Sequence, residues 1–448
     1  MARTGTFDAL PELARRSGAE HDRIYELLAQ LSDEVIRCPA AFNGLVAEQP
    51  YEVGADHWAR LRSNHGAIRR WQARSLQLLA ASVSGEAPAA VAASFLDHLP
   101  DYVGWRHHRT FPLSSLRPPQ FFRTDEATDG KLLEVQCPGS LWGTYEILRD
   151  AFAVVAEETS QRVPSLSAEF SEQLREILGT RPVVHHLLDN SSHPAGERYF
   201  IHRARSGVSY FSYDADVRPQ DCNFVRGHDF LSLLNENFAA GRLRATSEGV
   251  HLYDLPPVAL FDQKLLTALP FWEVTRDYYD DEIRALFPYT AVVAPEGIRL
   301  ETGDLLHFEQ FSRLPRRQRN YYLKYAGSDV SRNWGSRAVY HLGKLSQQGC
   351  SAYLARALEG FGAGERWIVQ LEQPTTWELP YVTHVDGPRT ARGHAKFSTF
   401  YGPTGPLGVL LMVESFYKVH GSAHTITDVG ALPAAAGCNG GTRDEDRS

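Results

Sequence analysis

A turn signal within residues 121–136 constrains the fold of this chain more than any other feature of its sequence. Asp129 and Gly130 stand between two short alternating runs, and an Asp-Gly pair in that setting predicts a β-hairpin. With those two residues at the centre of the turn, Asp125 directly faces Glu134 across the strand pair. The opposite face, which we expect to lie in the core, carries Phe122, Thr124, Leu133 and Val135.

The same register places Arg123 opposite Gln136, on the face that carries Asp125 and Glu134. Two carboxylates directly opposite each other repel, and a cation between them removes the repulsion. Magnesium is held by one or two carboxylates together with substrate phosphates, and arginine can grip a phosphate with two hydrogen bonds. The face therefore suggests a metal–phosphate site; the alternative is a solvent-exposed hairpin face that carries ordinary charges.

The composition is typical of a globular protein, with 43% hydrophobic and 22% charged residues in 448. A formal net charge of −8 gives no electrostatic support for a nucleic-acid partner. No run reaches the length of a membrane span and the N-terminus lacks an apolar leader, so we expect no membrane association. The five cysteines are odd in number and show no zinc spacing, which predicts reduced thiols and a cytoplasmic protein. We expect a monomer or a homodimer.

We expect an α/β (α+β) fold. A chain of 448 residues can bury a large core and is long enough for several structural units. The predicted units are a helical N-terminal region (1–116), a segment with the hairpin (117–180), a small α/β domain with a mainly parallel sheet (181–260), a larger mixed region (261–432) and a disordered tail (433–448).

Hydrophobic periodicity predicts the individual elements. Helices are expected across 19–100, with one ending near His98, and at 141–158, 167–178, 271–287 and 346–358. Strands are expected at 182–188, 321–325, 367–371, 395–401 and 409–413. The basic run at 315–320 is interpreted as solvated surface.

Two further stretches could carry chemistry. Lys324 stands in a predicted strand and is followed by a Gly/Ser-rich loop, an arrangement that can close over phosphates through backbone N–H groups. An ordinary polar hairpin loop is the alternative. About 40 residues later, alternation places Gln370 and Glu372 on one face of a strand, where they could contact an adenine edge.

The order of these motifs resembles the ATP-grasp superfamily, specifically the circularly permuted carboxylate–amine ligases similar to the synthetase domain of glutathionylspermidine synthetase. The matching residues are Arg123-x-Asp125, Leu133-Glu134-x-Gln136 with Pro138, Phe261 to Leu266, Leu323-Lys324 with the glycine loop, and Ile368-Val369-Gln370. The acidic motif precedes the lysines, as the permutation implies. The resemblance covers residues 117–430, with the small domain at 181–260 as the pre-ATP-grasp-like unit and 261–432 as the nucleotide-binding region.

The resemblance implies specific roles for residues of this chain. Asp125, Glu134 and Gln136 would hold Mg²⁺, and Arg123 would face the transferred phosphate. Residues implied to bind ATP are Lys264, Lys324, Gly327, Ser328, Ser331, Arg332, Gly335, Gln370, Leu371 and Glu372. Lys396 is a further candidate for substrate or phosphate contact. The chain departs from the family at Gln136, where asparagine is usual, and at Cys137, where an acidic residue is usual.

The implied activity is ATP-dependent joining of a small-molecule carboxylate to an amine through an acyl phosphate, in biosynthesis. The implied cofactors are ATP and Mg²⁺. Two alternatives stay open: a small-molecule kinase on the same fold, and a catalytically inactive nucleotide-binding or scaffold protein. The departures at Gln136 and Cys137 keep the inactive protein under consideration.

Overall fold

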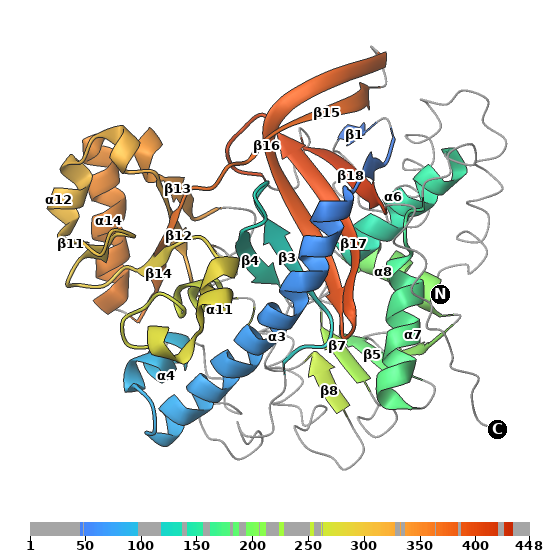
Figure 1. Cartoon of the computed structure of the whole chain (residues 1–448), viewed down its shortest axis with the longest axis horizontal. Coiled ribbons are helices and arrows are strands. Elements are labelled where there is room, and N and C mark those ends of the chain that lie inside the picture. The colour runs from blue at the N-terminus through green and yellow to red at the C-terminus, as the bar shows by residue number, and fades with distance from the viewer. Residues whose placement is uncertain are drawn as a thin grey trace.

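The computed structural model has an α/β fold in which β-sheets are covered by helices (Figure 1). It describes residues 45–47, 49–96, 118–136, 141–155, 162–179, 182–187, 194–205, 207–211, 224–227, 251–254, 261, 263–327, 332, 337–362, 364–383, 387–419 and 425–432. The predicted tail at 433–448 and the first part of the predicted helical region therefore lie outside the described residues.

The largest sheet has the strand order β15-β1-β18-β17-β16-β3-β4, with β2 beside β18. Its strands are β1 (Leu45–Ala47), β2 (Tyr51–Glu52), β3 (Phe122–Glu126), β4 (Leu132–Gln136), β15 (Thr376–Thr383), β16 (Gly387–Gly402), β17 (Gly405–Glu414) and β18 (Ile426–Ala431). The strands expected at 395–401 and 409–413 are confirmed within β16 and β17. The hairpin β3–β4 forms one edge of this sheet.

The prediction of helix throughout 19–100 is wrong at β1 and β2. β1 pairs in parallel with β18 and antiparallel with β15, and β2 pairs in parallel with β18. These partners lie more than 300 residues away along the chain. Local periodicity carries no information about such distant partners, since pairing with them decides whether a short apolar run becomes a strand.

A smaller antiparallel sheet has the order β13-β12-β14-β9. It consists of β9 (Thr290–Val292), β12 (Tyr321–Tyr325), β13 (Val339–His341) and β14 (Trp367–Leu371). The strands predicted at 321–325 and 367–371 are confirmed with the same bounds. The helix predicted from 346 is confirmed as α14 (Gln347–Gly362), which packs beside α12 (Phe308–Arg313).

The third sheet is entirely parallel, as predicted for the small α/β domain. Its order is β6-β5-β7-β8, formed by β5 (Val183–Leu187), β6 (Ser209–Phe211), β7 (Phe224–Gly227) and β8 (His251–Asp254). The predicted helices before it are confirmed as α6 (Trp142–Val155) and α7 (Leu166–Leu178), and α8 (Pro194–Ala204) follows β5. Ser165 caps α7 by accepting the Ala168 N–H at 3.3 Å, and Gly179 ends it in the left-handed conformation.

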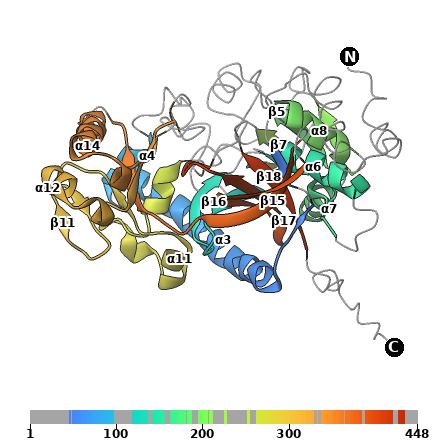
Figure 2. The same cartoon turned by 90° about the horizontal axis from the view of Figure 1, so that it is seen from above.

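Figures 1 and 2 place the smaller antiparallel sheet, with α12 and α14, at one end of the molecule, and α6, α7 and α8 at the other. The 30-residue helix α3 (Ala55–Ser84) runs diagonally past the large sheet in Figure 1. Its buried Trp71 belongs to the same core cluster as Phe122 and Val135 of the hairpin. The expected core face of the hairpin is thus covered by α3, with Leu133 only partly buried.

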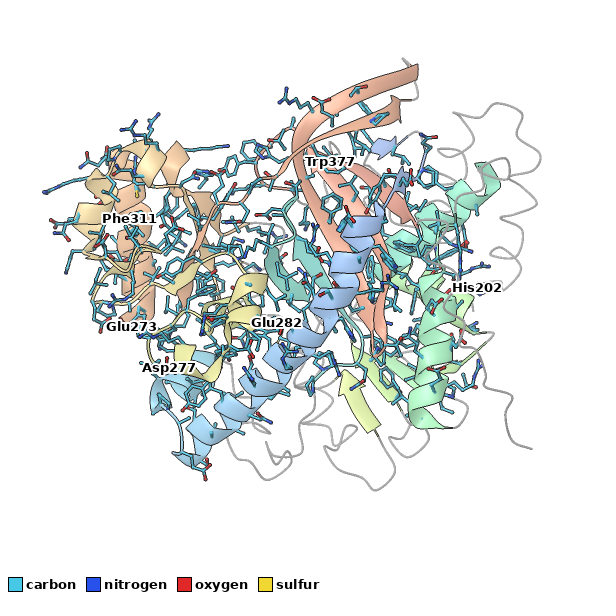
Figure 3. The ribbon with its side chains drawn as sticks, in the orientation of Figure 1. His202, Glu273, Asp277, Glu282, Phe311 and Trp377 are labelled. Atoms are coloured by element: carbon cyan, nitrogen blue, oxygen red, sulfur yellow. The ribbon has the colours of Figure 1, made fainter. Side chains whose placement is uncertain are left out.

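Helix α4 (Ala89–Leu96) follows α3 and confirms the helix predicted there, although its expected end near His98 lies outside the described residues. In Figure 3, Glu282 of α11 (Asp281–Leu286) is labelled beside α3, where it pairs with Arg70 at 2.5 Å. Within the described ranges no single helix is long and apolar enough to span a membrane. Among the described helices, α3 and Ala89–Phe95 of α4 form the one pair that together is long and apolar enough, and the pair is bent by 107°.

Between residues 264 and 320 one prediction is wrong, and a second is confirmed except at one residue. The aromatic helix expected at 271–287 is a series of turns with the 3₁₀-helix η6 (Arg276–Tyr278) and the short α11. Asp280 starts α11 by accepting the Ile283 N–H at 2.9 Å, which interrupts any longer helix. The basic run is solvated at Arg316 and Arg317, but Arg319 is buried and donates to the Leu345 carbonyl at 3.1 Å.

Candidate active site on the hairpin

The turn of the hairpin differs from the predicted one. The Ala127 carbonyl accepts the Gly130 N–H at 3.0 Å, so Thr128 and Asp129 are the central turn residues. Gly130 follows with φ +87°, a left-handed conformation that glycine adopts without strain. Asp129 accepts the Lys131 N–H at 3.1 Å and closes the loop. This three-residue connection shifts the pairing by one residue relative to the predicted two-residue turn.

A β-bulge restores the predicted register beyond the turn. Glu126 pairs with Leu132, but the next pair is Asp125 with Glu134, so Leu133 is the extra residue. Asp125 therefore faces Glu134, as predicted. The interpretation of this face as solvent-exposed is wrong, because Asp125 is 0% exposed.

Three adjacent strands build the centre of the site. Asp125 of β3 lies between Glu134 of β4 and Ser398 of β16 in the register of the sheet. The alternation of side chains places Arg123 and Lys396 on the same face. The register of β16, which pairs with β3, thus brings a lysine and a serine from 270 residues away to the hairpin.

Asp125 is held almost entirely by cations. Arg123 Nε donates to Asp125 Oδ1 at 3.0 Å, and Lys396 Nζ donates to Oδ2 at 2.7 Å. Ser398 Oγ adds a hydrogen bond to Oδ1 at 2.7 Å. Burial by itself would raise the pKa of Asp125, but the Arg123 and Lys396 charges outweigh it and hold that pKa well below its usual range. Asp125 is consequently a buried but ionised carboxylate.

Glu134 is bound by a different cation. Lys264 Nζ, at the start of the 3₁₀-helix η5 (Lys264–Ala268), lies 3.2 Å from Glu134 Oε2. Gln136 Nε2 donates to Glu134 Oε1 at 3.2 Å, and Gln136 Oε1 accepts a hydrogen bond from Arg123. The side chains of Arg123, Glu134 and Gln136 are thus linked, so the amide oxygen of Gln136 already has a donor.

The smaller antiparallel sheet contributes a third lysine. Lys324 Nζ donates to Gln370 Oε1 at 2.6 Å, and Gln370 Nε2 lies 3.3 Å from the Leu133 carbonyl on the hairpin. Burial, aided by the charges of Lys264 and Lys396, lowers the pKa of Lys324 to about 8 against the opposing charges of Glu134 and Asp125. These mutual effects place Lys264, Lys324 and Lys396 in one electrostatic cluster with the two carboxylates.

We call this set of six side chains the hairpin cluster: Arg123, Asp125, Glu134, Lys264, Lys324 and Lys396. Four of its members are cationic and two are carboxylates, so its formal charge is positive by two. Positive charge held at low exposure attracts an anion more strongly than the same charge in water does. The cluster is therefore suited to a polyanion such as a polyphosphate.

The glycine-rich loop is only partly described. Gly327 lies two residues after the end of β12 and is buried, whereas Ser328, Ser331 and Gly335 lie outside the described residues. Arg332 is engaged elsewhere: it pairs with Glu365 through hydrogen bonds of 2.8 and 2.7 Å, and its guanidinium lies 4.2 Å from the Tyr325 ring centre. The structure thus brings Lys324, but not Arg332, to the hairpin cluster.

The remaining predicted nucleotide residues lie along β14 and just after it. Gln370 contacts the hairpin cluster by accepting a hydrogen bond from Lys324. The backbone N–H of Leu371 donates to the Tyr289 carbonyl at 2.9 Å. Glu372 Oε1 lies 2.9 Å from His341 Nε2, and that hydrogen bond lowers the pKa of Glu372. This end of the strand combines a carboxylate, an imidazole and the ring of Tyr322, which lies 4.7 Å from the His341 ring.

The predicted metal ligands are Asp125, Glu134 and Gln136. Among the described residues, no three His, Cys, Asp or Glu side chains form a group that could hold a metal ion. Asp125 and Glu134 supply two facing carboxylates, which is the number that protein sites for Mg²⁺ commonly provide beside substrate phosphates. The donor set therefore fits a magnesium ion shared with a phosphate better than a metal held by the protein alone.

Ser398 is a site residue that the sequence reasoning missed. It is 0% exposed and binds Asp125, yet it stands in a plain strand with no motif. A signal did exist: Ser398 lies two residues after Lys396, and the strand period of two places both on one face. Lys396 was only a secondary candidate, and the structure gives it a direct ion pair with Asp125.

Comparisons with known proteins identify no family for this chain. No family model matches it, and no curated protein matches it. Among solved structures, it is similar to a glutathione synthetase-like effector from Globodera pallida in the apo form. The TM-score is 0.49 and the identity 12%, over 87% of this chain and 90% of that chain. This likeness is distant, and at this TM-score it carries no functional inference.

Proposed function

We propose that this protein is an ATP-dependent ligase that joins a small-molecule carboxylate to an amine, releasing ADP and phosphate. The observation that carries the proposal is the hairpin cluster, where four cations from separate parts of the chain surround two facing carboxylates. Five of these six positions, all except Lys396, belong to the motifs whose order resembles the permuted carboxylate–amine ligases. Motif order and spatial assembly thus agree on these five residues.

The proposed reaction has two steps, each with a role for the cluster. An oxygen of the substrate carboxylate forms a bond to the γ-phosphorus of ATP, and the bond from that phosphorus to ADP breaks. The amine nitrogen then bonds to the acyl carbon, loses a proton, and phosphate leaves. Arg123, Lys264 and Lys324 would bind phosphate oxygens and stabilise the negative charge that builds up during transfer.

Asp125 and Glu134 would hold magnesium in this proposal, with its remaining positions taken by phosphate oxygens and water. Bound there, the ion would neutralise phosphate charge and orient the transferred group. Lys396 and Lys264, which pair with these carboxylates at 2.7 and 3.2 Å, would turn from them toward phosphate oxygens. Gln136 would remain a positioning residue for Arg123, because its amide oxygen already accepts from that guanidinium.

The decisive experiment is incubation of the protein with Mg-ATP and a panel of carboxylates, amino acids and polyamines, with products analysed by mass spectrometry. ADP together with an amide supports the ligase. ADP together with a phosphoester supports the kinase alternative, and AMP contradicts both. Nucleotide binding without turnover of any panel member favours the inactive protein.

Two matched lysine variants test whether phosphate binding depends on the hairpin cluster or on surface charge in general. Lys264→Met removes the partner of Glu134 and should abolish ADP formation. Lys131→Met removes a lysine in the loop of the same hairpin, which donates to the Ala285 carbonyl at 2.5 Å outside the cluster. It should leave ADP formation unchanged. Equal loss in both variants would contradict the assignment of phosphate binding to the cluster.

A further inference from the structure

A buried arginine outside the hairpin cluster has two guanidinium nitrogens with no hydrogen-bond acceptor among the described residues. Arg226 stands in β7, an interior strand of the parallel sheet, and is 1% exposed. Its Nε and Nη1 atoms are buried and have no hydrogen-bond partner among the described residues. Burying an unpaired cation is costly, so such a group is rare in a folded protein unless it serves a ligand or partner.

Aromatic rings surround this guanidinium. Its Cζ atom lies 4.5 Å from the ring centre of Trp142, 4.8 Å from Phe200 and 5.0 Å from Phe170. Cation–π contacts stabilise the charge, most strongly where water is excluded. They do not satisfy the N–H groups, and the indole Nε1 of Trp142 also lacks a hydrogen-bond partner within the described part of the chain. The cage thus presents several buried donors and no described acceptor.

The cage lies next to the face that carries the hairpin cluster. Phe400 of β16 is the cross-strand neighbour of Arg123, so its side chain is on the same face as Asp125. The Phe400 ring lies 5.2 Å from the Trp142 ring, which contacts Arg226. Phe400 therefore relates the strand position of Arg123 to the indole that lies beside the unsatisfied donors.

Arg226 is also placed where parallel sheets bind ligands. It is the last residue but one of β7 and pairs in register with His186 near the carboxyl end of β5. Ligands of open parallel sheets bind beyond the carboxyl ends of the strands. Trp142, which covers the guanidinium, is the first residue of α6, and a helix N-terminus adds positive potential.

We propose that Arg226 and Trp142 bind a second, non-reacting carboxylate of the acid substrate, which is therefore a small dicarboxylate. The inference rests on the proposed function, because the reacting carboxylate belongs at the hairpin cluster. The guanidinium donates to the non-reacting carboxylate, the indole N–H adds a neutral hydrogen bond, and the aromatic rings exclude water. Since Arg226 is 1% exposed, the cage opens before the carboxylate enters, and association is slower than for an open site.

Binding of dicarboxylates without nucleotide or metal tests this site separately from turnover. The probes are succinate, glutarate and L-glutamate, with acetate and inorganic phosphate as comparisons, and affinities are measured by calorimetry. The native protein should bind at least one dicarboxylate more tightly than acetate or phosphate. Arg226→Met should weaken that binding by about tenfold or more, as expected for loss of a charged hydrogen bond, and Arg226→Lys should restore part of it.

Arg319→Met is the control for loss of a buried arginine, since Arg319 is 3% exposed and lies in the other half of the molecule, donating to the Leu345 carbonyl. It should keep the native dicarboxylate affinity. Melting temperatures recorded for each variant separate structural damage from loss of binding. The inference is overturned if Arg226→Lys and Arg226→Met bind like the native protein, if phosphate is preferred, or if no dicarboxylate binds. Dicarboxylate binding without any ADP formation would leave this site standing and remove the proposed ligase.

Discussion

Asp125 and Asp428 are both completely buried in the large sheet, but on its two opposite faces. The register runs from Asp125 through Ser398 and Leu410 to Val429, so Asp428, one residue earlier, points the other way. The two aspartates therefore share a residue type, a sheet and a degree of burial. They differ in their neighbours.

The neighbours determine the charge of each aspartate. Burial and then the Arg123 and Lys396 charges act on Asp125, and the cations prevail, so its pKa falls. Asp428 receives the Val429 N–H at 2.7 Å, while its Oδ2 atom has no partner among the described residues. Burial dominates there and raises the pKa of Asp428 well above its usual value. One face of the sheet thus holds ionised groups at low exposure, and the other holds a protonated carboxyl.

The largest effect should come from replacing each of these two aspartates in turn with asparagine. Asp125→Asn leaves Arg123 and Lys396 buried without their counter-charge and should cost about 3–5 kcal/mol of unfolding free energy. Asp428→Asn should change it by less than about 1 kcal/mol at neutral pH, because an amide resembles a protonated carboxyl. Urea unfolding curves measure both. Equal losses would show that burial alone, and not the neighbouring cations, distinguishes the two faces.

A catalytic substitution on the ionised face should separate activity from stability. Glu134→Gln keeps the shape of the side chain but removes the charge that pairs with Lys264, and should lower ADP formation about 10²–10³-fold. Its melting temperature should stay near that of the native protein, since Glu134 is partly exposed. Glu282→Gln, at an exposed ion pair with Arg70, is the control and should keep full activity. Full activity of Glu134→Gln would refute the hairpin as the reaction site.

Glu146 of α6 extends the comparison to a third buried carboxylate. Burial and then the charge of Asp150 raise its pKa from 4.5 to about 7, although it accepts the Ser167 N–H at 2.7 Å. The native state therefore keeps a proton that the unfolded chain releases between these values, and stability falls as pH rises through this window. Glu146→Gln should stabilise the protein by up to about 3 kcal/mol at pH 8 and by little at pH 5. A gain of the same size at both pH values would contradict this account.

The smallest effect should come from the titration of Lys324. Burial is the main reason that the pKa of this lysine is lowered to about 8. Below that pH the amine is charged, and above it the amine is neutral. Affinity for ATP should therefore decrease about tenfold between pH 7 and pH 9, as one charged contact to phosphate is lost. Lys324→Met should bind ATP weakly with little dependence on pH over this range. A native protein whose affinity is constant from pH 7 to pH 9 would show that Lys324 does not contact the phosphates.

The hairpin shows both the strength and the limit of local sequence signals. An Asp-Gly pair correctly indicated a hairpin and the facing of Asp125 and Glu134. The turn type was wrong, and the register agreed because the bulge at Leu133 offsets the three-residue loop. The position of a bulge depends on packing of both strands, so it could not be predicted from the residues near the turn.

Local sequence patterns could not predict strand pairings and side-chain contacts with distant parts of the chain. β1 and β2 become strands only beside β18, and Ser398 reaches Asp125 only through the pairing of β16 with β3. Arg226 stands in a short apolar strand and gives no sign in the sequence of the aromatic cage around it. By contrast, β12 and β14 have strong internal alternation, and their bounds were predicted correctly.

The hairpin cluster draws its side chains from four separate stretches of chain: β3–β4, the start of η5, β12 and β16. An anion bound there would join all four, since each stretch contributes a charge to it. Binding would then stabilise the native state as a whole, by an amount set by ligand concentration relative to its dissociation constant. Addition of a single small anion should then slow amide hydrogen exchange in all four stretches. That result would show that one ligand stabilises four separate segments of the chain together.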